Sequence, residues 1–202
     1  MRTLDLAATV ILVAALVISG YVAQFYPFNR FNNTSTGGGS PQPKPIIDGV
    51  IEKDEYLNSF KEADVTVYWY NDETLLYIAL RSPGKGWVSV GIGPIDAHYG
   101  ANYIFAAVDS GETTVSDQYG DARYSHVPDT TLGGEDNIVE YAGNQGLNGT
   151  VIEFSIPLDS KDRYDTKHSH GDTVDTLVAY QSTSTNFTKV HTKAGFLKLK
   201  IN

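Results

Sequence analysis

The sequence predicts an all-β fold, an antiparallel β-sandwich of immunoglobulin-like architecture preceded by one N-terminal transmembrane helix. Nine or so short runs of β-branched and aromatic residues occur between residues 46 and 202. Gly, Pro, Asn and Asp separate these runs at intervals typical of turns. No long run with helical periodicity follows the N-terminal apolar segment. We therefore expect short strands joined by turns and loops.

Each strand is predicted from its own residues. Residues 65–70 (VTVYWY) and 75–81 (LLYIALR) alternate around an Asn-Asp-Glu turn and predict a hairpin. The central stretch, 86–120, predicts three strands around a loop that carries His98. We also expect a short helical turn at Glu55, Tyr56 and Leu57 and a long polar loop after Gly120 that holds His126. The three strands of the central stretch cover residues 87–92, 103–108 and 113–118, and the remaining expected strands cover residues 138–142, 150–157, 174–182 and 196–201.

The N-terminus predicts a membrane anchor. Residues 6–25 contain no charged side chain, and 20 residues of helix span about 30 Å, the thickness of the hydrocarbon core. A secretory signal usually has a shorter apolar region and a better cleavage site, so we expect residues 1–28 to remain as an anchor. Residues 29–45 are rich in Ser, Thr, Gly and Pro and predict a stalk. Residues 46–202 then form the single folded domain.

This organisation predicts a cell-surface protein, anchored in the membrane with its domain outside the cytoplasm, or a secreted one if the N-terminal segment is cleaved. Glycosylation sequons at Asn32, Asn33, Asn148 and Asn186 agree with export and with possible glycans. The formal net charge of −9 argues against nucleic acid as a partner. The absence of cysteine excludes disulfides, thiolate metal sites and covalent haem attachment, and Met1 is the only methionine. Nothing in the sequence indicates the oligomeric state.

The order of several motifs resembles the DOMON domain, a family related to the cytochrome domain of cellobiose dehydrogenase and to ethylbenzene dehydrogenase gamma subunits. The resemblance covers about residues 46–201 and suggests a membrane-anchored prokaryotic member. It rests on DGxIxxxEY at 48–56, GWVSVGIGP at 86–94, the Gly-Ala-Asn that follows His98, VSDQYG at 115–120 and VPDTTLGG at 127–134.

The resemblance implies a β-sandwich that binds b-type haem or, in other branches of the family, sugars. Haem-binding members typically use a methionine in the loop before Gly-Ala-Asp and a histidine near the last strands as axial ligands. In this sequence these positions fall on His98 of HYGAN and His191 of KVHTKAGF. Histidine is itself a common iron ligand, so the departure from methionine favours bis-histidine coordination of haem b.

With both axial positions filled, the expected role is electron transfer with an unidentified redox partner, and not enzymatic catalysis. A bis-histidine site should have a lower potential than a Met/His site. We expect aromatic side chains to form the apolar haem pocket, namely Trp87, Tyr99, Tyr103, Phe105 and Phe196. Lys189, Lys193 and Arg123 are candidates for the haem propionates.

Other histidines leave alternatives open. His126 competes as a haem ligand if its loop folds over the same pocket. His168 and His170 lie in a run that looks solvated, and with Asp165 or Asp172 they could chelate a divalent metal.

The alternative function is a cell-surface carbohydrate-binding module without haem, with Trp69, Tyr70 and Tyr119 stacking on sugar rings. In that case acidic residues could hold a structural Ca²⁺, namely Asp109, Asp117, Asp129, Glu135 and Asp136. A third possibility is a purely structural surface protein that assembles through its sheet edges. No nucleophile motif, phosphate loop or H-E-x-x-H motif supports an enzyme.

Overall fold

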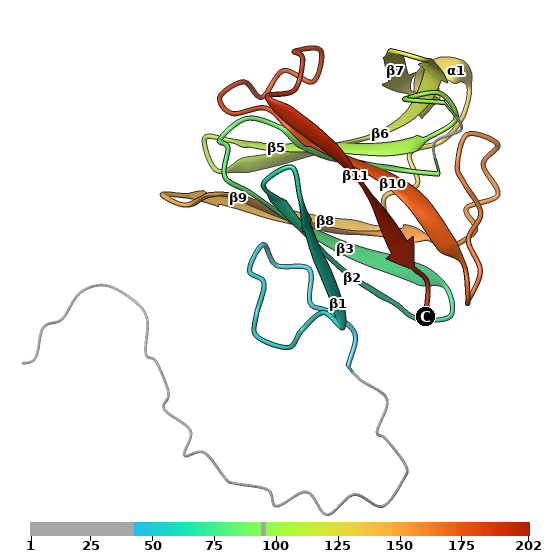
Figure 1. Ribbon diagram of the computed structural model, residues 1–202, viewed down its shortest axis with the longest axis horizontal. Coiled ribbons are helices and arrows are strands. Elements are labelled where there is room, and N and C mark those ends of the chain that lie inside the picture. The colour runs from blue at the N-terminus through green and yellow to red at the C-terminus, as the bar shows by residue number, and fades with distance from the viewer. Residues whose placement is uncertain (1–42, 94–95) are drawn as a thin grey trace, which may run out of the picture. The chain divides into compact units, whose positions relative to one another are not determined.

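The computed structural model describes residues 43–93 and 96–202, and these form two antiparallel sheets packed face to face (Figure 1). Eleven strands and one short helix make up this part of the chain. Their bounds are β1 Asn58–Glu62, β2 Val65–Asn71, β3 Leu75–Ser82, β4 Val88–Ile92, β5 Asn102–Asp109, β6 Glu112–Ala122, β7 Ser125–Pro128, α1 Asp129–Leu132, β8 Glu140–Gly146, β9 Gly149–Pro157, β10 Thr173–Tyr180 and β11 Lys193–Lys200.

The strands divide into a five-stranded and a six-stranded sheet. The five-stranded sheet has the order β1-β2-β3-β9-β8, and the six-stranded sheet has the order β11-β10-β4-β5-β6-β7. All neighbouring strands in both sheets are antiparallel. The predicted antiparallel β-sandwich is therefore confirmed, including the β2–β3 hairpin.

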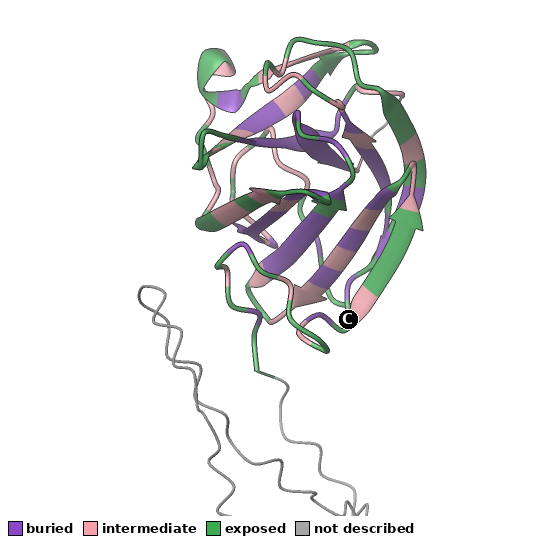
Figure 2. Cartoon of the chain, turned by 90° about the vertical axis from the view of Figure 1, so that its left-hand side faces the viewer, coloured by how far each residue is buried: buried purple, intermediate pink, exposed green. Residues whose placement is uncertain are grey.

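The main hydrophobic core fills the space between the sheets, where buried strand residues face one another (Figure 2). Val67, Ile78 and Phe154 enter it from the five-stranded sheet, and Ile104 and Val178 enter it from the six-stranded sheet. Side chains alternate across a strand, so one set of β-branched and aliphatic residues per strand is enough to build this core.

The six-stranded sheet is also buried on its outer face. On β5, Ile104 and Ala106 point into the main core, while Tyr103, Phe105 and Ala107 belong to a second apolar cluster outside the sandwich. β5 therefore has no polar face, and all of its residues except the last are buried. A strand buried on both faces requires a covering layer, which the loops of this sheet supply.

Two strands and the short helix depart from the sequence prediction. β1 is an edge strand whose central residues are exposed, so it has little apolar signal. The predicted polar loop after Gly120 contains β7 and α1, which lie together at one end of the six-stranded sheet (Figure 1). The helical turn expected at Glu55–Leu57 is wrong, because these residues lead directly into β1 without a helix.

The predicted anchor at residues 6–25 and most of the predicted stalk lie outside the described residues. Within the described ranges, no helix has the length and apolar character needed to cross a membrane. The domain boundaries at 28 and 45 remain predictions.

Candidate functional site

Three of the five histidines converge on one pocket on the outer face of the six-stranded sheet. The pocket has a volume of about 320 Å³, within the usual range for small-molecule and cofactor sites. Its walls come from the sheet, whose edge strand β7 carries His126, from the loop that carries His98, and from the β10–β11 loop. We call it the histidine pocket, lined by Trp87, Ser89, His98, Tyr103, Phe105, Tyr124, His126, Leu177, Val178, Ala179, Phe187, Thr188, Lys189, Val190, His191 and Ala194.

The floor of the pocket consists of aromatic rings on the sheet. Trp87 packs edge-on against Phe105, with ring centroids 5.0 Å apart, and Tyr103 contacts Phe105 at 5.7 Å. The Tyr103 ring lies flat against Gly91 on β4, where a Cβ atom would come within 2.3 Å of it. The glycine of the VSVGIGP motif thus lets a large ring lie on the sheet beside the histidines.

His98 is held by backbone contacts with a β-bulge. The pairing of β6 with β7 shifts register between Tyr119 and Ala122, and the chain before β5 docks there. Two backbone hydrogen bonds join the segment after His98 to Gly120 in the bulge. The N–H of Gly100 donates to Gly120 O at 2.9 Å, and the N–H of Gly120 donates to Ala101 O at 2.9 Å. Bulges often occur beside functional sites because they redirect a side chain. Here the bulge fixes the position of the His98 main chain.

His126 lies between the aromatic floor and His98. Its ring stacks on Phe105 at 4.3 Å and lies nearly parallel to the His98 ring at 6.0 Å. The Nδ1 atom of His126 is 2.6 Å from Oε1 of Gln118, an amide oxygen that only accepts. Nδ1 therefore carries the proton and donates, which leaves Nε2 of neutral His126 with a free lone pair.

The β10–β11 loop brings His191 to the pocket. The indole N–H of Trp87 donates to the carbonyl of Lys189 at 3.2 Å, and the Phe187 ring packs against Phe105 at 5.6 Å. The N–H of Thr192 donates to Tyr180 O at 2.7 Å and so fixes the chain directly after His191. His191 itself is exposed at the rim.

The electrostatics keep two of these histidines neutral. Burial, and then the nearby His191, lower the pKa of His98. Burial, and then His98, lower the pKa of His126 to about 4. Nδ1 of His98 is also buried without a hydrogen-bond partner. Neutral imidazoles with available lone pairs are the form that binds metals.

Several predicted pocket residues lie at the histidine pocket, and others do not. His98, His191, Trp87, Tyr103 and Phe105 line it. In contrast, the structure does not bring Tyr99 or Phe196 to it. Tyr99 is 43% exposed and packs against Tyr119, and Phe196 is 66% exposed on β11. Among the proposed propionate partners Lys189 lines the pocket, whereas Lys193 pairs with Asp64 and Arg123 with Asp96.

Sequence reasoning missed Phe187 and Leu177 as pocket residues. Leu177 alternates with the core residues of β10 and so faces outward, which its strand pattern could have indicated. Phe187 is an isolated aromatic residue in a polar loop and carries no periodic signal.

The aromatic residues of the carbohydrate alternative do not form an exposed row. Trp69 is 6% exposed in the main core, and its indole N–H donates to Lys200 O at 2.8 Å. Tyr70 and Tyr119 are half-buried on different sheets. The expectation that Trp69 stacks on sugar rings is therefore wrong.

His168 also differs from its prediction as a solvated residue. It is 5% exposed, and its backbone N–H donates to Leu158 O at 2.7 Å. Burial lowers the pKa of His168. His168 and His170 line a separate cavity of about 750 Å³, and neither Asp165 nor Asp172 lines it.

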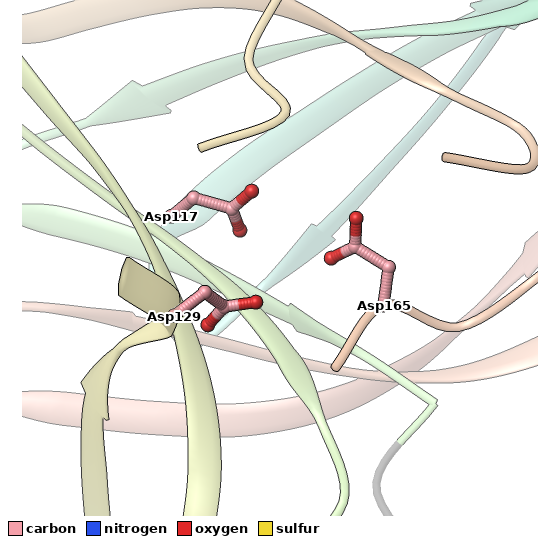
Figure 3. A group of neighbouring side chains, drawn as sticks. All are labelled: Asp117, Asp129 and Asp165. Carbon is pink, nitrogen blue, oxygen red and sulfur yellow. The ribbon is translucent and has the colours of Figure 1, made fainter. Parts of the chain in front are cut away.

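Asp165 instead meets two acidic residues from elsewhere in the chain. Asp117 of β6, Asp129 of α1 and Asp165 of the β9–β10 loop each offer a carboxylate oxygen, and these oxygens lie within 4.8 Å of one another. Figure 3 shows the three carboxylates pointing toward a common centre. We call this group the aspartate cluster. Of the acidic residues suggested for Ca²⁺, only Asp117 and Asp129 belong to it. Glu135 and Asp136 do not join it, and Asp109 lies exposed at the far end of β5.

Comparison with known proteins identifies the family. A family model described as the DOMON domain matches residues 61–181, more than half of the 202 residues. The chain belongs to the DOMON family, as the motif order predicted. A comparison with curated proteins found no match.

Two solved structures are similar to this chain. The cytochrome b domain of pyranose dehydrogenase from Coprinopsis cinerea has 13% identity and a TM-score of 0.53, covering 71% of this chain and 80% of that one. The cytochrome domain of Myriococcum thermophilum cellobiose dehydrogenase has 10% identity and a TM-score of 0.47, covering 72% and 88%. At this identity, the likeness to the first structure shows a shared fold.

Proposed function

We propose that this protein is a b-type cytochrome that binds one haem in the histidine pocket and transfers single electrons to or from a redox partner. The observation that carries this proposal is the convergence of His98, His126 and His191 on one aromatic-lined pocket. Membership in the DOMON family and the likeness to a cytochrome b domain support it at the level of family and fold.

The residues present fit a haem group. Two imidazoles are neutral at pH 7, and Nδ1 of His98 is buried without a partner in the protein. Apolar and aromatic side chains line the remaining walls, as a porphyrin ring requires. Lys189 at the rim supplies a cation for a propionate carboxylate.

We assign the axial positions to His98 and His191. The two residues come from different loops on one pocket, and His191 is near enough to His98 to affect its pKa. His126 has a different role in this assignment. Its ring is held between Phe105 and Gln118, so it serves as part of the wall and supports the position of His98.

Bound haem would supply a one-electron Fe³⁺/Fe²⁺ couple. His98 and His191 would hold the group through their imidazole nitrogens, and Trp87 and Phe105 would cover its buried side. With no open position for O₂ or peroxide, electron transfer and not catalysis is the function that these residues support. We further propose that residues 6–25 anchor the domain outside the cytoplasm, as the sequence predicts.

Haem titration of the full-length chain tests the proposal. Addition of one equivalent should produce a sharp Soret band, and dithionite should then produce resolved α and β bands of low-spin, six-coordinate haem. A chain that leaves the spectrum of free haem unchanged would overturn the cytochrome assignment.

A further inference from the structure

The aspartate cluster lies apart from the histidine pocket, on the other face of the same strands. Asp117 is paired with Ile104, a residue of the main core, so its side chain points between the sheets. The next residue, Gln118, points to the outer face and contacts His126. The cluster therefore closes one end of the sandwich and takes no part in the proposed haem site.

Two carboxylates of the aspartate cluster are buried with few polar partners. Asp117 is 4% exposed and Asp129 is 1% exposed, and both carboxylate oxygens of Asp129 are without a hydrogen-bond partner. In the described part of the chain, no Lys or Arg forms an ion pair with any of the three aspartates. Buried carboxylates are costly unless a proton, a cation or hydrogen bonds neutralise them.

A buried neutral amide lies against the same cluster. Asn102 on β5 is 5% exposed, and its Oδ1 is buried without a partner. Its amide is at the cluster, because Nδ2 lies 2.5 Å from Oδ1 of Asp165. A cation would favour the opposite amide orientation, in which Oδ1 faces the centre and becomes a ligand.

The surrounding loops are already fixed for binding. The N–H of Glu135 donates to Asp162 Oδ2 at 2.6 Å, and the hydroxyl of Tyr164 donates to Leu132 O at 2.9 Å. These bonds join the segment that carries Asp129 to the segment that carries Asp165. The N–H of Asn137 donates to Asp117 Oδ2 at 2.9 Å, which leaves Oδ1 of Asp117 free.

We propose that Asp117, Asp129, Asp165 and Asn102 form a structural Ca²⁺ site that joins β5, β6, α1 and the β9–β10 loop. All four donors are oxygens, the ligand type that Ca²⁺ prefers. Ca²⁺ takes about 6–8 oxygen ligands in flexible geometry, whereas Mg²⁺ demands a near-ideal octahedron and usually keeps several of its water molecules. Water molecules would complete the coordination.

The protonation behaviour agrees with this assignment. Burial, and then Asp165, raise the pKa of Asp117 to about 8 and that of Asp129 to about 7. Burial also raises the pKa of Asp165. The three groups thus lack a compensating positive charge, which a divalent cation would provide.

The test measures metal binding to the full-length chain, treated with chelator and kept free of haem. Calorimetric titration with CaCl₂ should show one site, and 1 mM Ca²⁺ should raise the melting temperature more than 1 mM Mg²⁺ does. The Asp165→Asn and Asp117→Asn variants should bind Ca²⁺ at least about 10–100-fold more weakly. Without Ca²⁺ they should melt close to the wild-type temperature, because burial already raises the pKa of both carboxyl groups and favours their neutral forms.

Asp109→Asn is the matched control, since it removes the same charge from an exposed residue at the far end of β5. It should keep the wild-type response to Ca²⁺. Should the variants fold poorly, Tb³⁺ bound to the wild-type chain provides a second measurement. Excitation of Tyr164 and Tyr119, whose rings are 5.2 Å apart beside the cluster, should sensitise Tb³⁺ emission that Ca²⁺ displaces.

Three results would overturn the proposal. They are the absence of Ca²⁺ binding by the wild-type chain, an equal effect of Mg²⁺, and an unchanged Ca²⁺ response in Asp165→Asn. None of them depends on haem, so failure here and failure of the cytochrome assignment are separate outcomes.

Discussion

Gly120 and the main-chain carbonyl of His98 are in direct contact. A Cβ atom at position 120 would lie 1.7 Å from that oxygen. Only glycine permits this approach, because any side chain would push the His98 segment away from the bulge in β6. The position of one proposed haem ligand therefore depends on a residue 22 positions later in the chain.

The first prediction concerns this contact. Gly120→Ala should destabilise the domain by about 3 kcal/mol or more and weaken haem binding, because the His98 main chain must move. Urea unfolding and haem titration measure the two effects. Gly146→Ala is the control, since a Cβ atom at that position meets nothing within 4 Å, and it should change neither quantity appreciably. A Gly120→Ala protein with normal stability and haem affinity would show that this contact does not fix the position of His98.

The second prediction compares the contributions of Phe187 and Phe196 to haem affinity. Phe187 packs on Phe105 in the pocket, whereas Phe196 is exposed on β11. Phe187→Ala should reduce haem affinity about tenfold, because loss of a partly buried ring removes roughly 1.4 kcal/mol of apolar contact. Phe196→Ala should leave the affinity nearly unchanged. The reverse order of effects would show that the pocket wall lies elsewhere.

The third prediction concerns the reduction potential. His98→Met would restore the Met/His ligand pair typical of the family, and methionine ligation raises the potential of haem. Spectroelectrochemical titration should give a higher midpoint for this variant than for the wild type. Gln118→Glu is an informative comparison, because it changes the group beside His126 and keeps both proposed ligands. A midpoint that is unchanged or lower in His98→Met would argue against His98 as a ligand.

The fourth prediction uses the pH dependence of stability. Glu153 is fully buried and accepts hydrogen bonds from Gly49 N–H at 2.7 Å, Asp48 N–H at 3.3 Å and Tyr56 Oη–H at 2.9 Å. Burial nevertheless raises the pKa of its carboxyl group. Since the folded-state pKa lies above the unfolded one, its contribution is complete below the ordinary range for Glu and is lost as the pH rises through the raised pKa.

Glu153→Gln removes this titration and disturbs the same hydrogen bonds. The variant should be less stable than wild type by about 1–3 kcal/mol at pH 4.5, and the difference should narrow toward pH 8. Urea unfolding of both proteins across this range measures the difference directly. A difference that widens with pH would mean that the ionised carboxylate is stabilised in the fold.

The sequence predicted the sandwich well because its strands follow simple alternation. β2, β3, β5 and β9 occupy nearly the predicted ranges, since each has a continuous apolar face. β1 and β7 were missed because they are short edge strands held by their neighbours and not by their own apolar residues. Family motifs placed His98 and His191, but alternation alone would have left both in unpatterned loops.

The remaining parts of the two sites depend on contacts between distant segments. Asp165 approaches Asp117 and Asp129 through the folding of the β9–β10 loop, and no local spacing indicates this. Tyr99 is next to His98 in the sequence, yet it points away from the pocket toward Tyr119. Adjacent residues in an irregular loop can face opposite directions, so their sequence positions do not determine which one lines a site.

The most direct test of the central claim is the absorption spectrum of the haem-loaded full-length chain in three variants, His98→Ala, His191→Ala and His126→Ala. We expect the first two to lose the low-spin, six-coordinate spectrum and to regain it when imidazole is added. His126→Ala should keep the spectrum, with weaker haem binding at most. Retention of the low-spin spectrum in either His98→Ala or His191→Ala, or its loss in His126→Ala with recovery by imidazole, would contradict the assignment of the axial pair.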